Sequence, residues 1–321
     1  MGNAVAGSLA PYAELLDALA GLTWPSVSRA RAGDPGAHRS SRLGRSPEFT
    51  EYRAYRPGDD LRRLDWKLYG RTDRLFLRIA DDHAALRTAI VVDASASMRF
   101  PLEGYGKWEH ACAIALGLTA IAVADGDAVG VTVAAAAGDR ALAPSRRRDV
   151  LHDVAQLFDS VHPVGSPSLL ETVSRMASQP RVVVISDWLG DAELALPALR
   201  VAAASGAEIV AVYVAADAEL NPPARPFVAS DPEAPEFQRA LSAENRAGYD
   251  AAFAAWRERV AGELHAMGAG WMFTVTGEPV REVVRRVIAG KWESGTGNGE
   301  LPGEVGVCGG VGVGGGGGGA S

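Results

Sequence analysis

The chain has 321 residues, of which 47% are hydrophobic and 22% charged, a composition typical of a folded protein with one large domain or two. Its two cysteines, Cys112 and Cys308, exclude a disulfide framework and a cysteine-based zinc site, and they favour a reducing cytoplasm. The longest apolar run, residues 111–124, is shorter than the about 20 residues that span a membrane, and the N-terminal residues lack the pattern of a secretory signal. We therefore expect a cytoplasmic protein without a membrane anchor.

The N-terminal part of the chain is predicted to form two regions. Its expected elements are a helix over 12–22, a strand over 48–56, a helix over 61–70 and a strand over 74–80. Asp59 or Asp60 is placed to cap the second helix. We therefore divide this part into a helix with a basic linker, 1–45, and a strand–helix–strand extension, 46–85.

Strands and helices alternate in the remainder of the chain. The expected strands cover 89–92, 128–135, 181–186, 207–215 and 271–276. The expected helices cover 107–124, 148–158, 169–177, 194–204, 237–267 and 279–288. This order predicts an α/β domain over 86–293, with a doubly wound, mostly parallel sheet and helices on both faces. A Pro-rich surface insertion is expected at about 218–236, and the Gly-rich tail 294–321 is expected to be disordered.

The net charge of −7 is unevenly distributed, because residues 39–78 hold ten Arg and one Lys against six acidic residues, about +5 in all. Nucleic-acid binding through this Arg-rich segment is one alternative. However, Asp59, Asp60, Asp65 and Asp73 lie within it and would repel phosphate groups. We favour a salt-bridged surface there and do not expect nucleic acid as the partner.

Two of the predicted strands end in aspartate, Asp93 and Asp187, and parallel strands bring their carboxyl ends to one rim of the sheet. After the first strand, Asp93, Ser95 and Ser97 follow at two-residue spacing, so an extended segment presents one carboxylate and two hydroxyls on one side. Hard oxygen ligands of this kind suit Mg²⁺ or Mn²⁺. The structural alternative is that Asp93 caps a turn and the serines cap the next helix. Without metal, we expect the Asp93 carboxylate to be solvated.

This pattern resembles the metal-ion-dependent adhesion site of von Willebrand factor A domains, whose first motif is Asp-x-Ser-x-Ser. The resemblance implies that an Asp after a later strand, here Asp187, and a Thr from a middle loop complete the site. The corresponding loop of this chain has no Thr at that place but offers Ser166 or Ser168. The resemblance thus implies a divalent metal held by Asp93, Ser95, Ser97, Asp187 and one of these two serines.

A second resemblance covers about residues 15–288. The bacterial family called domain of unknown function 58 carries the signature Tyr-x-Pro-Gly-Asp-Asp-x-Arg-x-Ile-Asp-Trp. In this chain the matching residues are Tyr55, Pro57, Gly58, Asp59, Asp60, Arg62 or Arg63, Leu64, Asp65 and Trp66. Members are commonly associated with AAA+ ATPases of the MoxR type and are thought to be adaptors in protein assembly or maturation. The resemblance therefore implies a protein partner of that type.

The signature region itself is a candidate partner-binding surface. Its candidate residues are Asp59, Asp60, Arg62, Arg63, Trp66 and Arg71. We favour a structural interpretation, in which the aspartates cap a turn and a helix, the arginines pair with them, and Trp66 covers the edge of the sheet.

Enzymatic alternatives fit the sequence less well. A phosphohydrolase of the haloacid dehalogenase type would need a second Asp where this chain has Ser95, although a metal-dependent phosphohydrolase stays an alternative. The chain has no Walker-type nucleotide motif and no glycine fingerprint after its first main strand. We therefore predict a metal-dependent protein-binding module that is not an enzyme.

Overall fold

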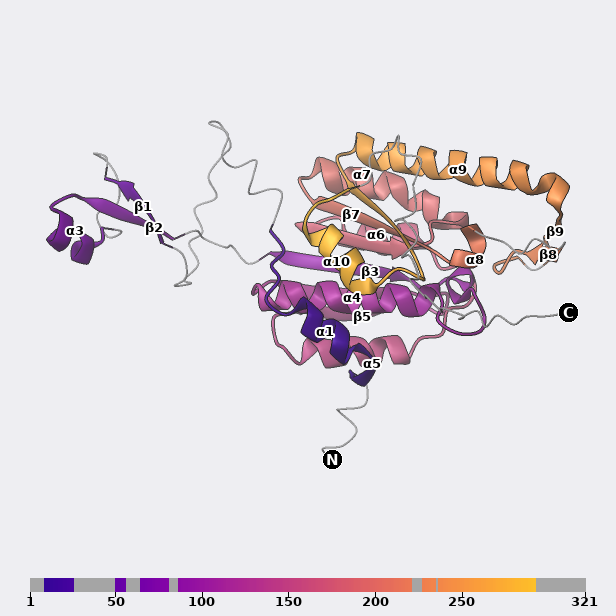
Figure 1. Ribbon diagram of the computed structural model, residues 1–321, viewed down its shortest axis with the longest axis horizontal. Helices are drawn as coiled ribbons and strands as arrows, with labels where there is room; N and C mark the ends of the chain where they lie inside the picture. The colour runs from indigo at the N-terminus through magenta and orange to yellow at the C-terminus, as the bar shows by residue number, and fades with distance from the viewer. Residues whose placement is uncertain are drawn as a thin grey trace, which may run out of the picture.

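The computed structural model describes residues 9–25, 50–55, 64–80, 86–220, 227–234 and 236–292. Its main body is a six-stranded sheet with the order β10-β7-β6-β3-β4-β5 (Figure 1). The strands are β3 (Arg87–Asp93), β4 (Ala128–Ala134), β5 (Arg140–Ser145), β6 (Arg181–Ser186), β7 (Glu208–Ala215) and β10 (Gly270–Val275). All neighbours in the sheet pair in parallel except β4 and β5.

Helices cover both faces of this sheet. One face packs against α1 (Ala13–Leu19), α4 (Lys107–Ala124), α5 (Val150–Asp159) and α10 (Val280–Ile288). The other face packs against α6 (Leu169–Met176), α7 (Leu196–Ala204) and α9 (Ala243–Ala266). Successive strand residues alternate between the two cores, so that Ile90 and Val92 belong to the first and Val91 to the second. The predicted doubly wound, mostly parallel α/β fold is confirmed.

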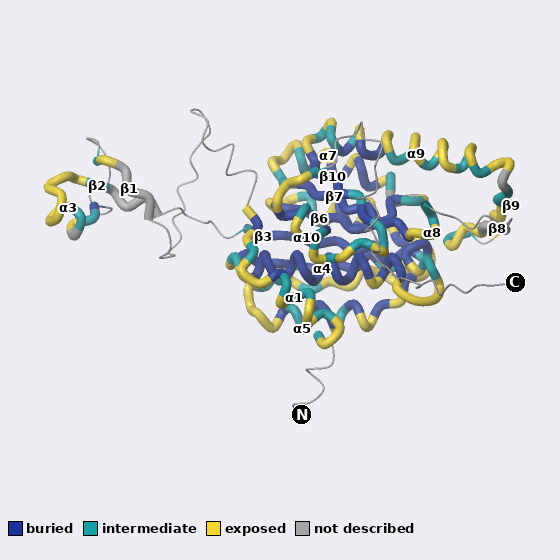
Figure 2. The backbone as a smooth tube through the Cα atoms, in the orientation of Figure 1, coloured by how far each residue is buried: buried dark blue, intermediate teal, exposed yellow. Residues whose placement is uncertain are grey.

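Helix α4 runs through the centre of the first core, and Figure 2 shows it buried over most of its length. Its bounds agree with the helix predicted over 107–124. A Cβ at Gly117 would lie 2.9 Å from a methyl carbon of Leu19, so the small residue permits the close approach of α1. None of the helices in the described ranges combines the length and the apolarity needed to cross a lipid bilayer.

Several elements of the main body differ from the sequence prediction. Strand β5 was not predicted, because this edge strand is largely exposed and includes Pro144, so it lacks a strand's apolar alternation. A hairpin of β8 (Phe227–Ser230) and β9 (Gln238–Leu241) lies next to the short helix α8 (Asp217–Leu220), and of its two strands only β8 falls within the expected insertion 218–236. Because β9 occupies the start of the expected helix 237–267, α9 begins only at Ala243.

The signature extension forms a small unit of its own, in which β1 (Thr50–Ala54) and β2 (Phe76–Ala80) pair antiparallel around α3 (Trp66–Thr72). The Asp65 carboxylate accepts a hydrogen bond from Leu68 N at 3.0 Å and thereby caps α3. The helix expected over 61–70 therefore begins later than predicted, with a different cap. Three parts of the prediction lie outside the described residues. They are the part of the linker at 26–45, the capping residues Asp59 and Asp60, and the tail 294–321.

Candidate functional site

The candidate site lies between β3 and β6, where the strand order reverses. From β3 the sheet continues through β4 to β5, whereas from β6 it continues through β7 to β10. Asp93 is the last residue of β3, and Asp187 directly follows β6. The structure therefore brings the two predicted carboxylates to the same rim, at the point where open α/β sheets bind ligands.

The Asp93 carboxylate is buried, with 3% of the residue exposed. Its two oxygens accept hydrogen bonds from Ser95 N at 2.8 Å and from the Ser186 hydroxyl at 2.7 Å. Burial, and next the charge of Asp187, raise the pKa of Asp93 from 3.8 to about 7. The expectation that this carboxylate is solvated without metal is wrong, because residues of other segments, among them Ser166, Leu189 and Glu233, lie around it.

The backbone after Asp187 is held in an unusual conformation. Trp188 has a φ of 52°, which costs a bulky residue about 1–3 kcal/mol. The residue is fully buried, with its indole N–H donating to Val212 O at 3.3 Å, and its ring lies edge-on to that of Trp271. This packing fixes the turn that aims Asp187 at the rim.

The two motif serines lie side by side. Ser95 Oγ and Ser97 Oγ are 3.0 Å apart, and both residues are buried. Adjacent ligands of an octahedral Mg²⁺ at 2.0–2.1 Å are also about 3 Å apart. Ser95 precedes the short 3₁₀ helix Ala96–Arg99, but its hydroxyl makes no hydrogen bond to the backbone of that helix. The structural alternative is therefore met only in part: Asp93 caps the turn by accepting from Ser95 N, whereas the Ser95 hydroxyl does not cap the helix.

The two candidate serines of the middle loop lie in different surroundings. It is tied to the motif by hydrogen bonds from Ala96 N to Gly165 O at 2.8 Å and from Val164 N to Ala94 O at 3.1 Å. Ser166 lines a small cavity together with Asp93 and Ser95. The Ser168 hydroxyl instead accepts a hydrogen bond from Glu171 N at 3.3 Å and caps α6.

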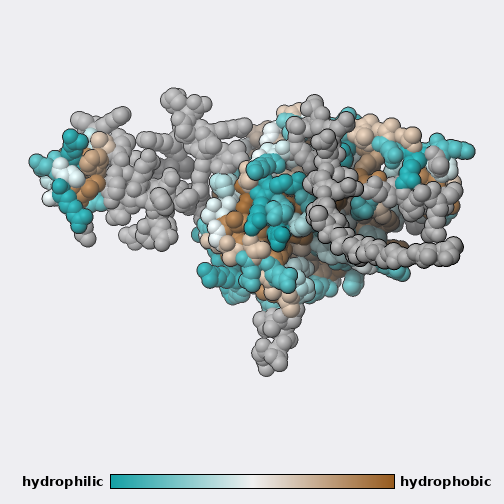
Figure 3. Space-filling view, in the orientation of Figure 1, coloured by the Kyte–Doolittle hydropathy of each residue, from teal (hydrophilic) through white to brown (hydrophobic). Residues whose placement is uncertain are grey.

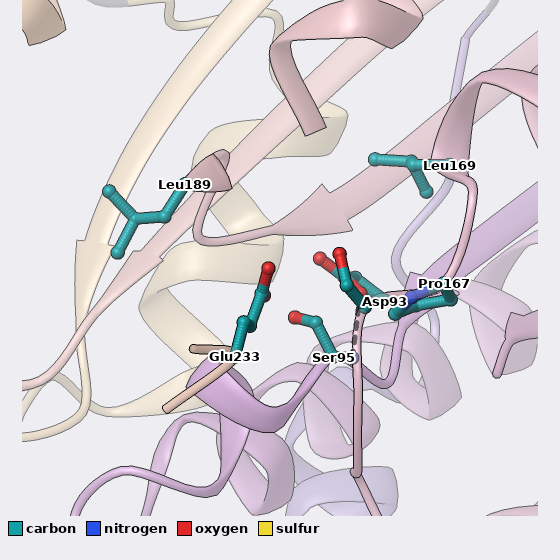
Figure 4. A pocket seen from close by; sticks show the side chains of 7 residues that line it. Asp93, Ser95, Pro167, Leu169, Leu189 and Glu233 are labelled. Carbon is teal, nitrogen blue, oxygen red and sulfur yellow. Dashed lines mark hydrogen bonds between the residues drawn. The ribbon is translucent and has the colours of Figure 1, made fainter. Parts of the chain in front are cut away.

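Glu233 lines the same cavity, and its side chain points toward Asp93 and Ser95 (Figure 4). The complete lining consists of Asp93, Ser95, Ser166, Pro167, Leu169, Leu189 and Glu233. The volume of this cavity is about 10 Å³, enough for one water molecule or one small ion. Partial burial raises the pKa of Glu233, while a hydrogen bond with Ser166 opposes that shift.

A buried lysine completes the surroundings of the site. Lys107 Nζ lies 2.7 Å from Asp187 Oδ2 and 2.6 Å from Glu219 Oε1, and its side chain is 0% exposed. As the first residue of α4 it stands at the end of the helix where a cation is disfavoured, so the two carboxylates hold it there. The sequence analysis identified neither Lys107 nor Glu219 as a site residue. The strand-end rule could have found Glu219, which follows β7 on the same rim, but nothing in the sequence marked Lys107.

The residues of the site fit a small divalent cation. Asp93, Asp187, Glu219 and Lys107 together carry two negative charges in excess when all four are ionised, beside a pair of hydroxyls at a spacing suitable for Mg²⁺. No group of three or more His, Cys, Asp or Glu side chains is placed to hold a metal within the described ranges. The site instead combines carboxylates with serine hydroxyls.

The signature residues divide between described and undescribed parts of the chain. Asp59, Asp60, Arg62 and Arg63 lie outside the described residues. Trp66 is 64% exposed, so it does not cover a sheet edge, and that expectation is wrong. Because the expected helix begins at Trp66, this side chain emerges from the first turn, where it packs edge-on against the ring of Tyr69.

Arg71 is also exposed on this unit. Figure 3 shows apolar and hydrophilic side chains next to each other on the described part of the extension, which Figure 1 draws away from the main sheet. Trp66 and Arg71 therefore do not belong to the same site as Asp93 and Asp187.

Comparison with known proteins identifies the family. Residues 51–259 match the family model described as "Protein of unknown function DUF58". The chain belongs to the DUF58 family. The resemblance that its signature predicted is thereby confirmed.

Two mycobacterial proteins are similar to this DUF58 chain. It is 28% identical over 242 residues to the uncharacterized protein Rv1480 of Mycobacterium tuberculosis, a match covering 73% of this chain and 76% of that protein. The uncharacterized protein Mb1516 of Mycobacterium bovis gives the same identity and the same coverage, 73% and 76%.

Solved structures similar to this DUF58 chain include BatB from Bacteroides thetaiotaomicron, with 14% identity, a TM-score of 0.43, and coverage of 64% of this chain and 99% of that chain. The VWA domain of SpRpn10 has 9% identity and a TM-score of 0.38, and covers 63% of this chain and 95% of its own. The fold assignment rests on the sheet order of this chain itself.

Proposed function

We propose that this DUF58 protein is a metal-dependent protein-binding module without enzymatic activity of its own. The observation that carries the proposal is the meeting of Asp93 and Asp187, from two separate strand ends, with the serine hydroxyl pair beside a cavity of about 10 Å³. Carboxylates and hydroxyls form a hard ligand set that suits Mg²⁺ or Mn²⁺.

Each residue of the site has a part in this proposal. Ser95, Ser97 and Ser166 would supply hydroxyl ligands, while Asp93 and Asp187 would supply negative charge. Ser166 is preferred to Ser168 because its side chain lines the cavity, whereas that of Ser168 caps α6. The metal would supply an exchangeable coordination position that accepts an Asp or Glu of a partner protein.

We further propose an AAA+ ATPase of the MoxR type as the partner, and an adaptor role in protein assembly or maturation. The family resemblance supports this part of the proposal, because DUF58 members are commonly associated with such ATPases. A cytoplasmic location, expected from the two cysteines, belongs to the same proposal and stays a prediction.

The test is a binding titration between the full chain and a purified MoxR-type ATPase of the same host, in Mg²⁺, in Mn²⁺ and in excess chelator. Asp93→Asn removes a candidate ligand charge, and Asp250→Asn, an exposed position on α9, is the matched control. We expect chelator and Asp93→Asn each to weaken binding of the ATPase at least about tenfold, because removing a group that supports a bound metal commonly lowers affinity by that factor or more. Asp250→Asn should bind the ATPase as wild type does.

Equal affinity in metal and in chelator would refute the metal-dependent interaction. Metal binding by calorimetry without any binding of the ATPase would refute the partner and leave the metal site in place. A phosphate-releasing activity of the purified chain that disappears in Asp93→Asn would refute the non-enzymatic assignment.

A further inference from the structure

The hairpin β8–β9 reaches across the sheet rim and carries Glu233 to the candidate metal site. Its turn is shaped by Asp231, whose Oδ1 accepts hydrogen bonds from Glu233 N at 2.9 Å and Ala234 N at 3.4 Å. Asp231 N in turn donates to Phe237 O at 3.0 Å and closes the turn. This local structure directs the Glu233 side chain inward, while Glu236 stays exposed.

Glu233 makes contacts with three separate segments of the rim. Its Oε1 accepts a hydrogen bond from Ser97 Oγ at 3.4 Å, and a further hydrogen bond joins it to Ser166. On the third side it lies against Gly190, where an added Cβ would come within 2.9 Å of Oε2. The absence of a side chain at Gly190 thus leaves the space that the carboxylate fills.

The neighbouring residues of the same turn border a second hollow. Ser230, Asp231 and Pro232 line a groove of about 770 Å³, whose opposite side includes Leu102 and Val164. Leu102 is 78% exposed and Val164 is 49% exposed, so the groove presents apolar side chains to solvent. The turn therefore forms one wall of both the groove and the metal cavity.

We propose that Glu233 is a built-in carboxylate ligand of the candidate metal site and holds the place that an acidic residue of a partner would take. The hairpin thereby acts as an autoinhibitory latch on the rim. This inference rests on the proposed function, because it assumes that the rim binds a divalent cation. A partner would have to displace Glu233, and the adjoining groove favours an acidic residue flanked by apolar ones.

The experiment uses Mn²⁺ as the probe and the full chain in three forms: wild type, Glu233→Ala and the control Glu236→Ala. Free Mn²⁺ is measured by electron paramagnetic resonance, and the number of bound waters by water proton relaxation. We expect Glu233→Ala to weaken Mn²⁺ binding at least about tenfold and to add a water to the bound ion, whereas Glu236→Ala matches wild type.

Acetate provides a second readout, because it can enter the space that the truncated side chain leaves. Millimolar acetate should restore Mn²⁺ affinity in Glu233→Ala and have no effect on wild type.

The outcomes separate the two proposals. If wild type binds no Mn²⁺, the metal site itself is refuted and the latch falls with it. If wild type binds Mn²⁺ but Glu233→Ala shows the same affinity, the same bound water and no acetate effect, the latch is refuted while the metal site stands.

Discussion

The two ends of strand β6 each bury a basic side chain between two carboxylates, but with different consequences. At the start of the strand, Arg181 pairs with Glu208 at 3.1 Å and Asp127 at 3.7 Å, and its guanidinium lies 4.1 Å from the ring centre of Trp24. Beyond its other end, Lys107 pairs with Asp187 and Glu219.

The difference lies in what surrounds each cluster. The ring of Trp24 covers the Arg181 cluster. The Arg181 guanidinium also donates a hydrogen bond to Pro25 O at 3.2 Å. The Lys107 cluster stands beside a further buried carboxylate, Asp93, together with paired hydroxyls and a cavity. Each trio has one carboxylate in excess of its basic side chain, but only the Lys107 cluster adds a further buried carboxylate, Asp93, next to hydroxyls that can serve as metal ligands.

The largest expected effect comes from removing the two basic residues in parallel. We expect Lys107→Met and Arg181→Met each to lower the free energy of unfolding by about 3–5 kcal/mol in chelator, because each leaves buried carboxylates without a counter-charge. Mg²⁺ should restore part of the loss in Lys107→Met and none in Arg181→Met. Urea unfolding with and without Mg²⁺ measures the free energy of unfolding of the two variants. If Mg²⁺ stabilised them equally, the Lys107 cluster would not differ from the Arg181 cluster in binding a cation.

A smaller effect is expected from pH. Because the pKa of Asp93 is about 7 in the folded protein and 3.8 is its ordinary value, the folded state binds this proton more tightly. The stability that this group contributes is therefore present at low pH and is lost as pH rises from about 4 to about 7, by at most roughly 1.4 kcal/mol per pH unit.

Asp93→Asn isolates this contribution. In chelator, the variant should lose less stability than wild type between pH 5 and pH 8, as measured by urea unfolding at each pH. Saturating Mg²⁺ should also remove most of the dependence in wild type, because the cation favours the ionised carboxylate. Parallel pH profiles for the variant and wild type would contradict the raised pKa.

The smallest expected effects distinguish the two loop serines. Ser168→Ala should cost about 1 kcal/mol of stability through the lost cap of α6 and leave Mn²⁺ affinity unchanged. Ser166→Ala should weaken Mn²⁺ binding several-fold with a stability change within about 0.5 kcal/mol. Calorimetric titration measures the Mn²⁺ affinity of each variant, and thermal melting measures its stability. If Ser168→Ala lost Mn²⁺ affinity and Ser166→Ala lost stability, Ser168 would be the third hydroxyl ligand.

The sequence by itself determined the parallel strands of the sheet and the motif residues Asp93, Ser95, Ser97 and Asp187 at its rim. Buried strands such as 181–186 contain unbroken apolar runs, here residues 182–185, and helix 107–124 is apolar from residue 111 onward except for Thr119. Elements that are covered on both sides need such sequences. Asp93 and Asp187 could be predicted as neighbours because parallel strands end at one rim, and the spacing of Ser95 and Ser97 follows from local geometry.

Only the tertiary structure decided what surrounds those residues. Lys107 meets Asp187 and Glu219 across 80 and 112 residues of chain, and Glu233 meets Ser97 across 136. Nothing in the local sequence of these residues specifies those partners. The burial of Asp93 could not be predicted from the sequence either, because it results from distant segments that pack around the rim. Periodicity records which face of an element is covered, whereas the pairing of distant charged side chains is fixed only when the elements pack together.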